Sequence, residues 1–141
     1  MILPDVNVLL YAFRRDSHDH TRYRRWVDDT VNGHAAYGVA PQELASLVRI
    51  STNRRIYVRP SGLAEAFAFC RAVLEPSHCT VVQPGSRHWD IFAGLCDKAH
   101  VTGNLVQDAW FAALAIESGC EWITTDRDYG RFPGLRWRAP F

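Results

Sequence analysis

The chain has 141 residues, of which 48% are hydrophobic and 22% charged, and its formal net charge at pH 7 is +1. This length allows one domain with a substantial hydrophobic core, and no Pro/Gly/Ser-rich tract indicates a linker or a disordered tail, so a single domain over residues 1–141 is expected. So small a net charge does not by itself indicate a nucleic-acid-binding protein. Basic residues nevertheless gather in three segments, 22–26, 49–59 and 131–138.

The amino-terminal residues predict neither a signal peptide nor a membrane span. The stretch MILPDVNVLLYAF has no basic start, and Pro4, Asp5 and Asn7 interrupt its apolar run. We therefore expect a cytoplasmic protein with no membrane partner. The cysteines show no CxxC pairing and are expected to be buried free thiols; they are Cys70, Cys79, Cys96 and Cys120.

Hydrophobic periodicity predicts strands that alternate with helices. Short strands are expected at 1–5, 35–40, 79–84, 121–124 and 135–138. Helices are expected at 6–13, 20–32, 41–54, 61–75, 86–100 and 104–118. The helix at 61–75 is amphipathic, with an apolar face formed by Leu63, Ala66, Phe67, Cys70, Val73 and Leu74. This alternation predicts an α/β fold in which helices cover both faces of a parallel sheet.

Four acidic residues lie near the ends of these elements. Asp5 closes the first strand and Asp126, within ITTDRDYG, closes the fourth, at the edge where open parallel sheets bind ligands. Glu43 lies in a first helical turn, where interaction with the helix dipole would be reason enough for a glutamate. Asp108 lies in an almost wholly apolar helix, where a carboxylate is costly unless an arginine, a hydrogen bond or a cation compensates it.

A cluster of these carboxylates would require cations, because close negative charges repel one another. Carboxylate oxygens are hard ligands that suit Mg²⁺ or Mn²⁺. The nearest candidates for a zinc site are His18 and His20, but no further ligands lie nearby in the sequence, so a solvated turn is expected there.

Four segments resemble, in order and spacing, the successive motifs of PIN-domain proteins, and in particular of the VapC ribonuclease toxins of bacterial toxin–antitoxin pairs. They are ILPDVNVLLYAF, PQELASL, GNLVQDAWFAALAIESG and ITTDRDYGRFPGL, and together they cover essentially the whole chain. The resemblance implies a three-layer α/β/α domain with a parallel sheet of about five strands. It also implies a metal site formed by Asp5, Glu43, Asp108 and Asp126, with Asp128 as a candidate fifth ligand.

Two further residues would support such a site. Asn7 stands where members of the family often carry Ser or Thr, and its amide would orient Asp5 or a water molecule. Thr125 lies beside Asp126 and would hydrogen-bond water or phosphate.

The function implied by the resemblance is that of a Mg²⁺-dependent endoribonuclease, with Mn²⁺ as the other candidate metal, acting as the toxin of a toxin–antitoxin pair. Its partners would be RNA and a small antitoxin whose tail enters the acidic site or lies in a groove between helices. A homodimer or a hetero-oligomer with the antitoxin is expected.

Two alternatives stay open. A PIN-like module without catalytic activity would bind RNA or a protein and cut nothing. A haloacid-dehalogenase-like phosphohydrolase would need an aspartate at position 7 and a lysine between its motifs, whereas this chain has Asn7, and its single lysine is Lys98.

Overall fold

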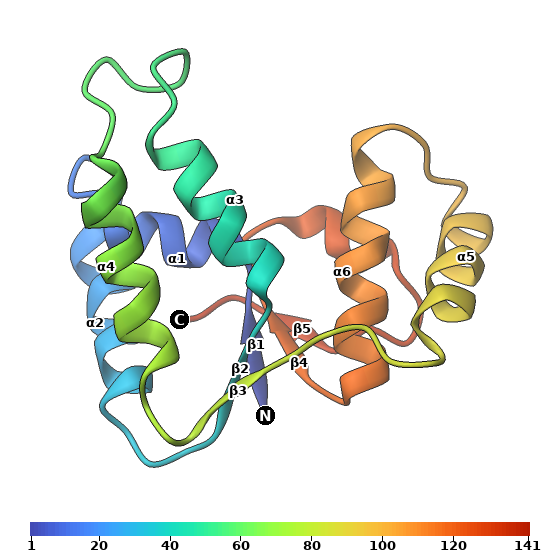
Figure 1. The fold of residues 1–141 in the computed structure, drawn as a ribbon. Helices are drawn as coiled ribbons and strands as arrows, with labels where there is room; N and C mark the ends of the chain where they lie inside the picture. Colours follow the sequence, from blue (N-terminus) through green and yellow to red (C-terminus); the bar gives the residue numbers. More distant parts are fainter.

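A sheet of five parallel strands forms the centre of the computed structural model, which describes residues 1–141 (Figure 1). The strands are β1 (Ile2–Pro4), β2 (Tyr37–Val39), β3 (Cys79–Val81), β4 (Glu121–Ile123) and β5 (Trp137–Arg138). Their order in the sheet is β3-β2-β1-β4-β5, and every neighbouring pair is parallel. All five predicted strands are confirmed, although each is shorter than predicted.

The helices form a layer on each face of this sheet. They are α1 (Val6–Phe13), α2 (His20–Val31), α3 (Pro41–Ser51), α4 (Leu63–Leu74), α5 (His88–Ala99) and α6 (Asn104–Ser118). In Figure 1, α1 to α4 lie on the left of the sheet, and α5 and α6 lie side by side on the right. A short 3₁₀ helix, η1 (Arg127–Arg131), follows β4. The predicted three-layer α/β/α fold is confirmed.

Each helix layer encloses its own hydrophobic cluster against the sheet. Trp122 belongs to the cluster under α5 and α6, whereas Ile123 belongs to the cluster under α1, α3 and α4, and both side chains are fully buried. Neighbouring residues of a strand point to opposite faces, so a strand of only three residues can serve both clusters. This explains why the central strands β1 and β2 read as short runs without polar side chains.

The arrangement of the strands fixes the place where a site can form. β2 and β3 lie on one side of β1, whereas β4 and β5 lie on the other, so the strand order reverses at β1. Crossover connections diverge at such a point and leave a crevice beyond the carboxyl ends of the strands. The segments that leave β1 and β4 therefore border a natural binding site.

The predicted apolar face of α4 is only partly buried. Ala66, Cys70 and Val73 are buried, but Leu63 is 60% exposed and Phe67 is 52% exposed. The exposed part of this face borders an open, largely apolar groove of about 680 Å³ between α3 and α4, whose lining includes Leu44, Ala45, Val48, Phe67 and Leu74. Periodicity indicates how wide an apolar face is, but it does not show which part of that face another element covers.

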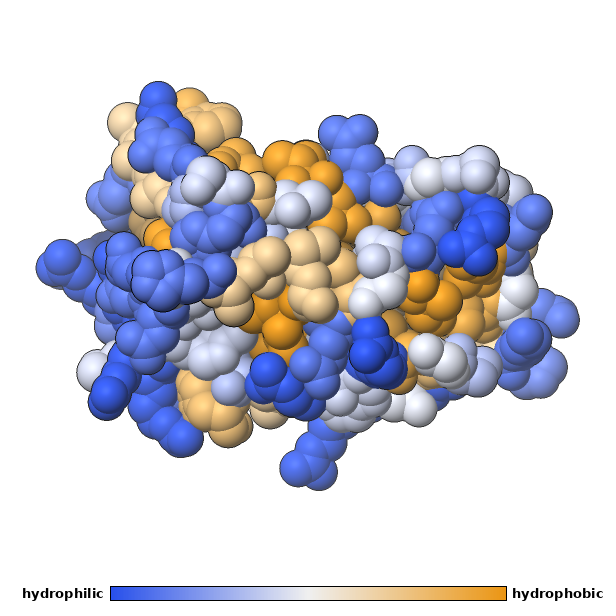
Figure 2. Space-filling model, turned by 90° about the horizontal axis from the view of Figure 1, so that it is seen from below, coloured by the Kyte–Doolittle hydropathy of each residue, from blue (hydrophilic) through white to orange (hydrophobic).

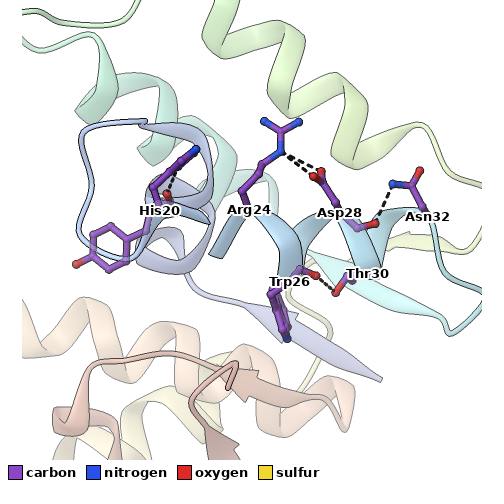
Figure 3. A network of polar contacts seen from close by, with 7 residues as sticks. His20, Arg24, Trp26, Asp28, Thr30 and Asn32 are labelled. Carbon is purple, nitrogen blue, oxygen red and sulfur yellow. Dashed lines mark hydrogen bonds and ion pairs between the residues drawn. The ribbon is translucent and has the colours of Figure 1, made fainter. Parts of the chain in front are cut away.

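The polar side chains of α2 form most of their hydrogen bonds and ion pairs within the same helix. Arg24 Nε bonds both carboxylate oxygens of Asp28 at 3.0 and 3.1 Å, and Thr30 donates to the carbonyl of Trp26 (Figure 3). Hydrophilic residues cover the left end of the underside of the molecule, the side on which α2 lies (Figure 2). The arginines of segment 22–26 are thus partly neutralised by acids of their own helix.

Two further expectations concern membranes and cysteines. None of the helices has both the length and the apolar character needed to cross a membrane. All four cysteines are free thiols, as predicted, but Cys79 and Cys96 are only half-buried, so full burial is confirmed for Cys70 and Cys120 alone.

Candidate active site

The predicted acids lie around the carboxyl ends of the central strands. Asp5 directly follows β1, and Asp126 lies shortly after β4 and immediately before η1. Glu43 lies in the first turn of α3, which starts two residues after β2 ends, and Asp108 lies near the start of α6. Four separate elements thus carry one carboxylate each toward the point where the strand order reverses.

Asp5 is held by hydrogen bonds from the end of β4 and from the first turn of α1. It is 5% exposed, and its Oδ2 accepts the hydroxyl of Thr124 at 2.5 Å and the Nδ2 of Asn7 at 2.9 Å. Burial raises the pKa of Asp5 to about 6, and the charge of Asp108 adds to this rise, while the hydrogen bonds oppose it. The predicted orienting role of Asn7 agrees with this contact.

Thr124 is a residue of this candidate site that the sequence analysis missed. Its fully buried hydroxyl donates to Asp5 and accepts the backbone N–H of Asp126 at 3.0 Å and the Nδ2 of Asn7 at 3.2 Å. Thr125, which was predicted instead, is exposed and lies against the hydroxyl of Tyr23. Strand alternation offered the missing signal, because two adjacent threonines at a strand end cannot both face the same side.

We expect Thr124→Val to lower the free energy of unfolding by about 2 kcal/mol, because this isosteric change leaves the N–H of Asp126 and the amide of Asn7 without their acceptor. The matched variant Thr125→Val, at the exposed neighbour, is expected to change it by about 0.5 kcal/mol or less. Urea denaturation of both variants measures the difference. Equal losses would show that the hydroxyl of Thr124 does not join the two strand ends.

Glu43 is a buried carboxylate that lacks a full set of partners. It is 1% exposed, and its Oε2 accepts the backbone N–H of Val6 at 2.8 Å. Its Oε1 is buried without any hydrogen-bond partner. Burial raises the pKa of Glu43 well above its usual value, and the charges of Asp5 and Asp108 raise it further. Helix-dipole stabilisation alone therefore does not account for this glutamate.

Asp108 is half-buried and takes part in no ion pair. Burial is the largest cause that raises the pKa of Asp108, and the charges of Asp126 and Asp128 raise it further. Arg131 and a hydrogen bond from Tyr129 lower it. The ring of Tyr129 is 3% exposed, and the pKa of its hydroxyl is raised by burial and by the four charges of Asp5, Asp108, Glu43 and Asp126. All four carboxylates thus act on one buried hydroxyl.

Asp128 differs from these four residues because its carboxylate is exposed. Its Oδ1 pairs with Arg131 at 2.7 Å, and its backbone N–H donates to Asp126 Oδ1 at 2.8 Å. The last contact caps η1 and fixes the carboxylate of Asp126. A metal-ligand role for Asp128 stays a prediction.

The chemistry of these residues fits a divalent cation, although no three His, Cys, Asp or Glu side chains stand in an arrangement that would hold a metal ion. Two acceptors, Glu43 Oε1 and Asn7 Oδ1, are buried without partners. The available donors are carboxylate and amide oxygens, which are hard ligands of the kind that Mg²⁺ and Mn²⁺ prefer. His18 lies apart from them in an exposed turn. A bound cation would have to draw the carboxylates closer together.

Comparison with known proteins identifies the family of this chain. The family model described as the PIN domain matches residues 2–135. The chain belongs to the PIN-domain family. The matched region includes all four of the predicted acids, Asp5, Glu43, Asp108 and Asp126.

Relatives within the PIN-domain family cover nearly the whole chain. Ribonuclease VapC25 of Mycobacterium tuberculosis is 41% identical over 140 residues, which is 99% of this chain and 99% of that protein. Ribonuclease VapC43 of the same species is 36% identical, over 99% of this chain and 95% of the relative. Both relatives are named as VapC ribonucleases.

Solved structures share the PIN fold at low sequence identity. VapBC2 from Rickettsia felis, bound to a DNA fragment from its promoter, superposes with a TM-score of 0.71 at 16% identity, covering 99% of this chain and 98% of that chain. VapC20 of Mycobacterium tuberculosis, described as a toxin that cleaves the sarcin–ricin loop, gives a TM-score of 0.65 at 16% identity and covers 96% and 99%. Both comparisons establish the three-layer fold.

Proposed function

We propose that this chain is a metal-dependent endoribonuclease that acts as the toxin of a toxin–antitoxin pair. The observation that carries the proposal is the buried Oε1 of Glu43, which has no partner although it lies among other carboxylates. A negative charge placed there without compensation is costly, and a divalent cation compensates it directly. Full-length relatives named as VapC ribonucleases support the choice of RNA as substrate.

Within this proposal each site residue has a distinct task. Asp5, Glu43, Asp108 and Asp126 hold Mg²⁺ or Mn²⁺. When bound, such a cation lowers the pKa of an attacking water and stabilises negative charge on the leaving oxygen. Thr124 and Asn7 fix the orientation of Asp5, and the backbone N–H of Asp128 fixes Asp126. The chain thus supplies positioned oxygens, and few of its groups need to move protons.

Binding of the RNA backbone is assigned to the basic segment 49–59. Arg49, Arg54, Arg55 and Arg59 are exposed, none of them forms an ion pair, and residues 44–64 contain no acid. The arginines of α2 are weaker candidates, because Arg24 is already paired with Asp28. Exposed arginines without partners attract phosphates at little desolvation cost.

An antitoxin would occupy the groove between α3 and α4. The exposed side chains of Phe67 and Leu74 border it, and Arg49 and Arg71 also line it. An amphipathic segment with acidic residues at its edges fits this combination of apolar surface and arginines. Solved neighbours such as VapBC2 are toxin–antitoxin complexes, which supports an antitoxin as the partner.

The decisive measurement is cleavage of single-stranded RNA by the purified protein in Mg²⁺, in Mn²⁺ and in chelator. We expect cutting only with a divalent cation, and we expect Asp126→Asn to lower the rate about 10²- to 10³-fold, the scale typical for loss of one group that stabilises charge. An asparagine Oδ1 still accepts the N–H of Asp128, so the fold should persist. Asp97→Asn, on the exposed face of α5, serves as the matched control.

Other outcomes of this assay would favour the alternatives. Release of phosphate from a small ester, with RNA left intact, would indicate a phosphohydrolase. Retention of RNA on a filter without cleavage in any metal would indicate a binding module without catalytic activity. Cleavage that persists in chelator would contradict the metal-dependent assignment.

A further inference from the structure

A second cavity lies directly beside the acidic site, between the start of α3 and the paired helices α5 and α6. Its volume is about 440 Å³, within the range of roughly 300–1,000 Å³ that is usual for small-molecule sites. Two amides and several apolar or aromatic side chains line it, and no charged residue does. The lining, called here the glutamine–aromatic pocket, includes Gln42, Gln107, Phe92, Val106, Trp110 and Phe111.

The pocket and the acidic site share the same two helical segments. Gln42 immediately precedes Glu43 in α3, and Gln107 immediately precedes Asp108 in α6. Consecutive residues of an α-helix point about 100° apart. Each helix therefore directs a carboxylate into the acidic site and an amide into the adjoining pocket. The two amides thus lie next to the two carboxylates along the chain and line the adjoining pocket.

The aromatic wall of the pocket is fixed in place by its own packing. The side chain of His88 is 3% exposed. Its ring lies edge-on to the ring of Trp110, with 4.6 Å between the ring centroids, and it stacks with the ring of Phe92, with 6.3 Å between the centroids. A ring nitrogen of His88 also lies 2.9 Å from the carbonyl oxygen of Trp110. Trp89, which is 69% exposed, extends this aromatic surface from Phe92 into the solvent. A ligand that enters the pocket meets a preformed apolar surface.

We propose that the glutamine–aromatic pocket binds an unpaired nucleobase of the RNA, next to the phosphate that is cut. This inference rests on the proposed function, because it names a part of the substrate of the same site. Single-stranded bases bind proteins by stacking on aromatic rings and by hydrogen bonds to their edges. The amides of Gln42 and Gln107 each offer a donor and an acceptor for such an edge. A phosphate is not the ligand, since the pocket has no positive charge.

The first test follows the binding of the four ribonucleoside 5′-monophosphates by NMR, without any need for cleavage. We expect at least one of them to shift the side-chain amide signals of Gln42 and Gln107 and the indole signal of Trp110. The double variant Gln42→Ala/Gln107→Ala should weaken that binding about tenfold. Gln83→Ala, which removes the third glutamine of the chain at an exposed position, should leave it unchanged.

The second test uses an RNA that the protein cuts, with single bases removed in turn around the cleaved bond. Loss of one base beside that bond should slow cleavage about tenfold, and this effect should vanish in the Gln42→Ala/Gln107→Ala variant. Equal effects at every position, or nucleotides that shift none of the three signals, would overturn the inference. So would pocket signals that shift on protein dilution alone, because a second copy of the chain would then cover the pocket. Absence of any RNA cleavage would count against the proposed function, while the nucleotide titration would still decide the pocket.

Discussion

Glu43→Gln is expected to raise the free energy of unfolding of the metal-free protein and to abolish RNA cleavage. The gain should be about 1–4 kcal/mol, the range that Coulomb's law gives for one like-charge neighbour at 4 Å between bulk water and a site near a protein surface. Glutamine keeps an oxygen for the N–H of Val6, and its neutral amide adds no charge to those of Asp5 and Asp108. Thermal and urea denaturation in chelator measure the change.

Glu65→Gln is the matched control for this experiment. Glu65 also lies in the first turn of a helix, α4, but it is exposed. There the removal of a favourable interaction with the helix dipole should cost about 0.3–1 kcal/mol, so the two variants are expected to differ in sign. The Glu43→Gln protein should also gain less stability from Mg²⁺ or Mn²⁺ than the parent protein gains. A lower melting temperature of Glu43→Gln in chelator would mean that Glu43 is a structural carboxylate.

The sequence predicted the elements of the fold well because most of its signals are local. Pro41 correctly marked the start of α3, but the helix ends at Ser51 and not at residue 54. The residues beyond Ser51 form a turn in which the side chain of Asn53 accepts the backbone N–H of Arg55. Such competition between a side chain and the helical backbone pattern depends on local geometry that periodicity does not reveal.

Prediction was weaker wherever the outcome depends on spatial neighbours. The sequence singled out Thr125, whereas Thr124 contacts Asp5, because the choice depends on the strand face that meets β1. The pairing of Arg24 with Asp28, by contrast, was signalled by their i, i+4 spacing in the predicted helix, although the sequence analysis did not use that signal. The glutamine–aromatic pocket was not foreseen, since Gln42 and Gln107 are far apart in the chain and come to line one pocket only in the folded protein.

The second large effect concerns pH, and it runs opposite to ordinary acid denaturation. The folded-state pKa of Asp5 is about 6 against an ordinary value of 3.8, so between these values the folded protein binds a proton that the unfolded chain releases. The metal-free protein should therefore become more stable as the pH falls from about 7 to about 5, because protonation removes the penalty of the buried charge. The full shift corresponds to about 3 kcal/mol, of which just under half is gained by pH 5 and the rest as the pH falls further toward 3.8. The raised pKa of Glu43 acts in the same direction.

Divalent cations should reverse the sign of this pH dependence. In saturating Mg²⁺ or Mn²⁺ the charged carboxylates are the stabilising form, so acid competes with the metal and the stability should fall over the same pH window. Urea denaturation at pH 7, 6 and 5, in chelator and in divalent salt, gives both slopes. Asp5→Asn should make the slope in chelator shallower, with the remainder coming from Glu43, whereas Asp16→Asn should retain the full slope, because the pKa of Asp16 is lowered by its hydrogen bond to Arg14. A metal-free protein that loses stability steadily from pH 7 to pH 5 would show that the carboxylates at the sheet edge are already compensated without a cation, and the metal-dependent mechanism would then lose its physical basis.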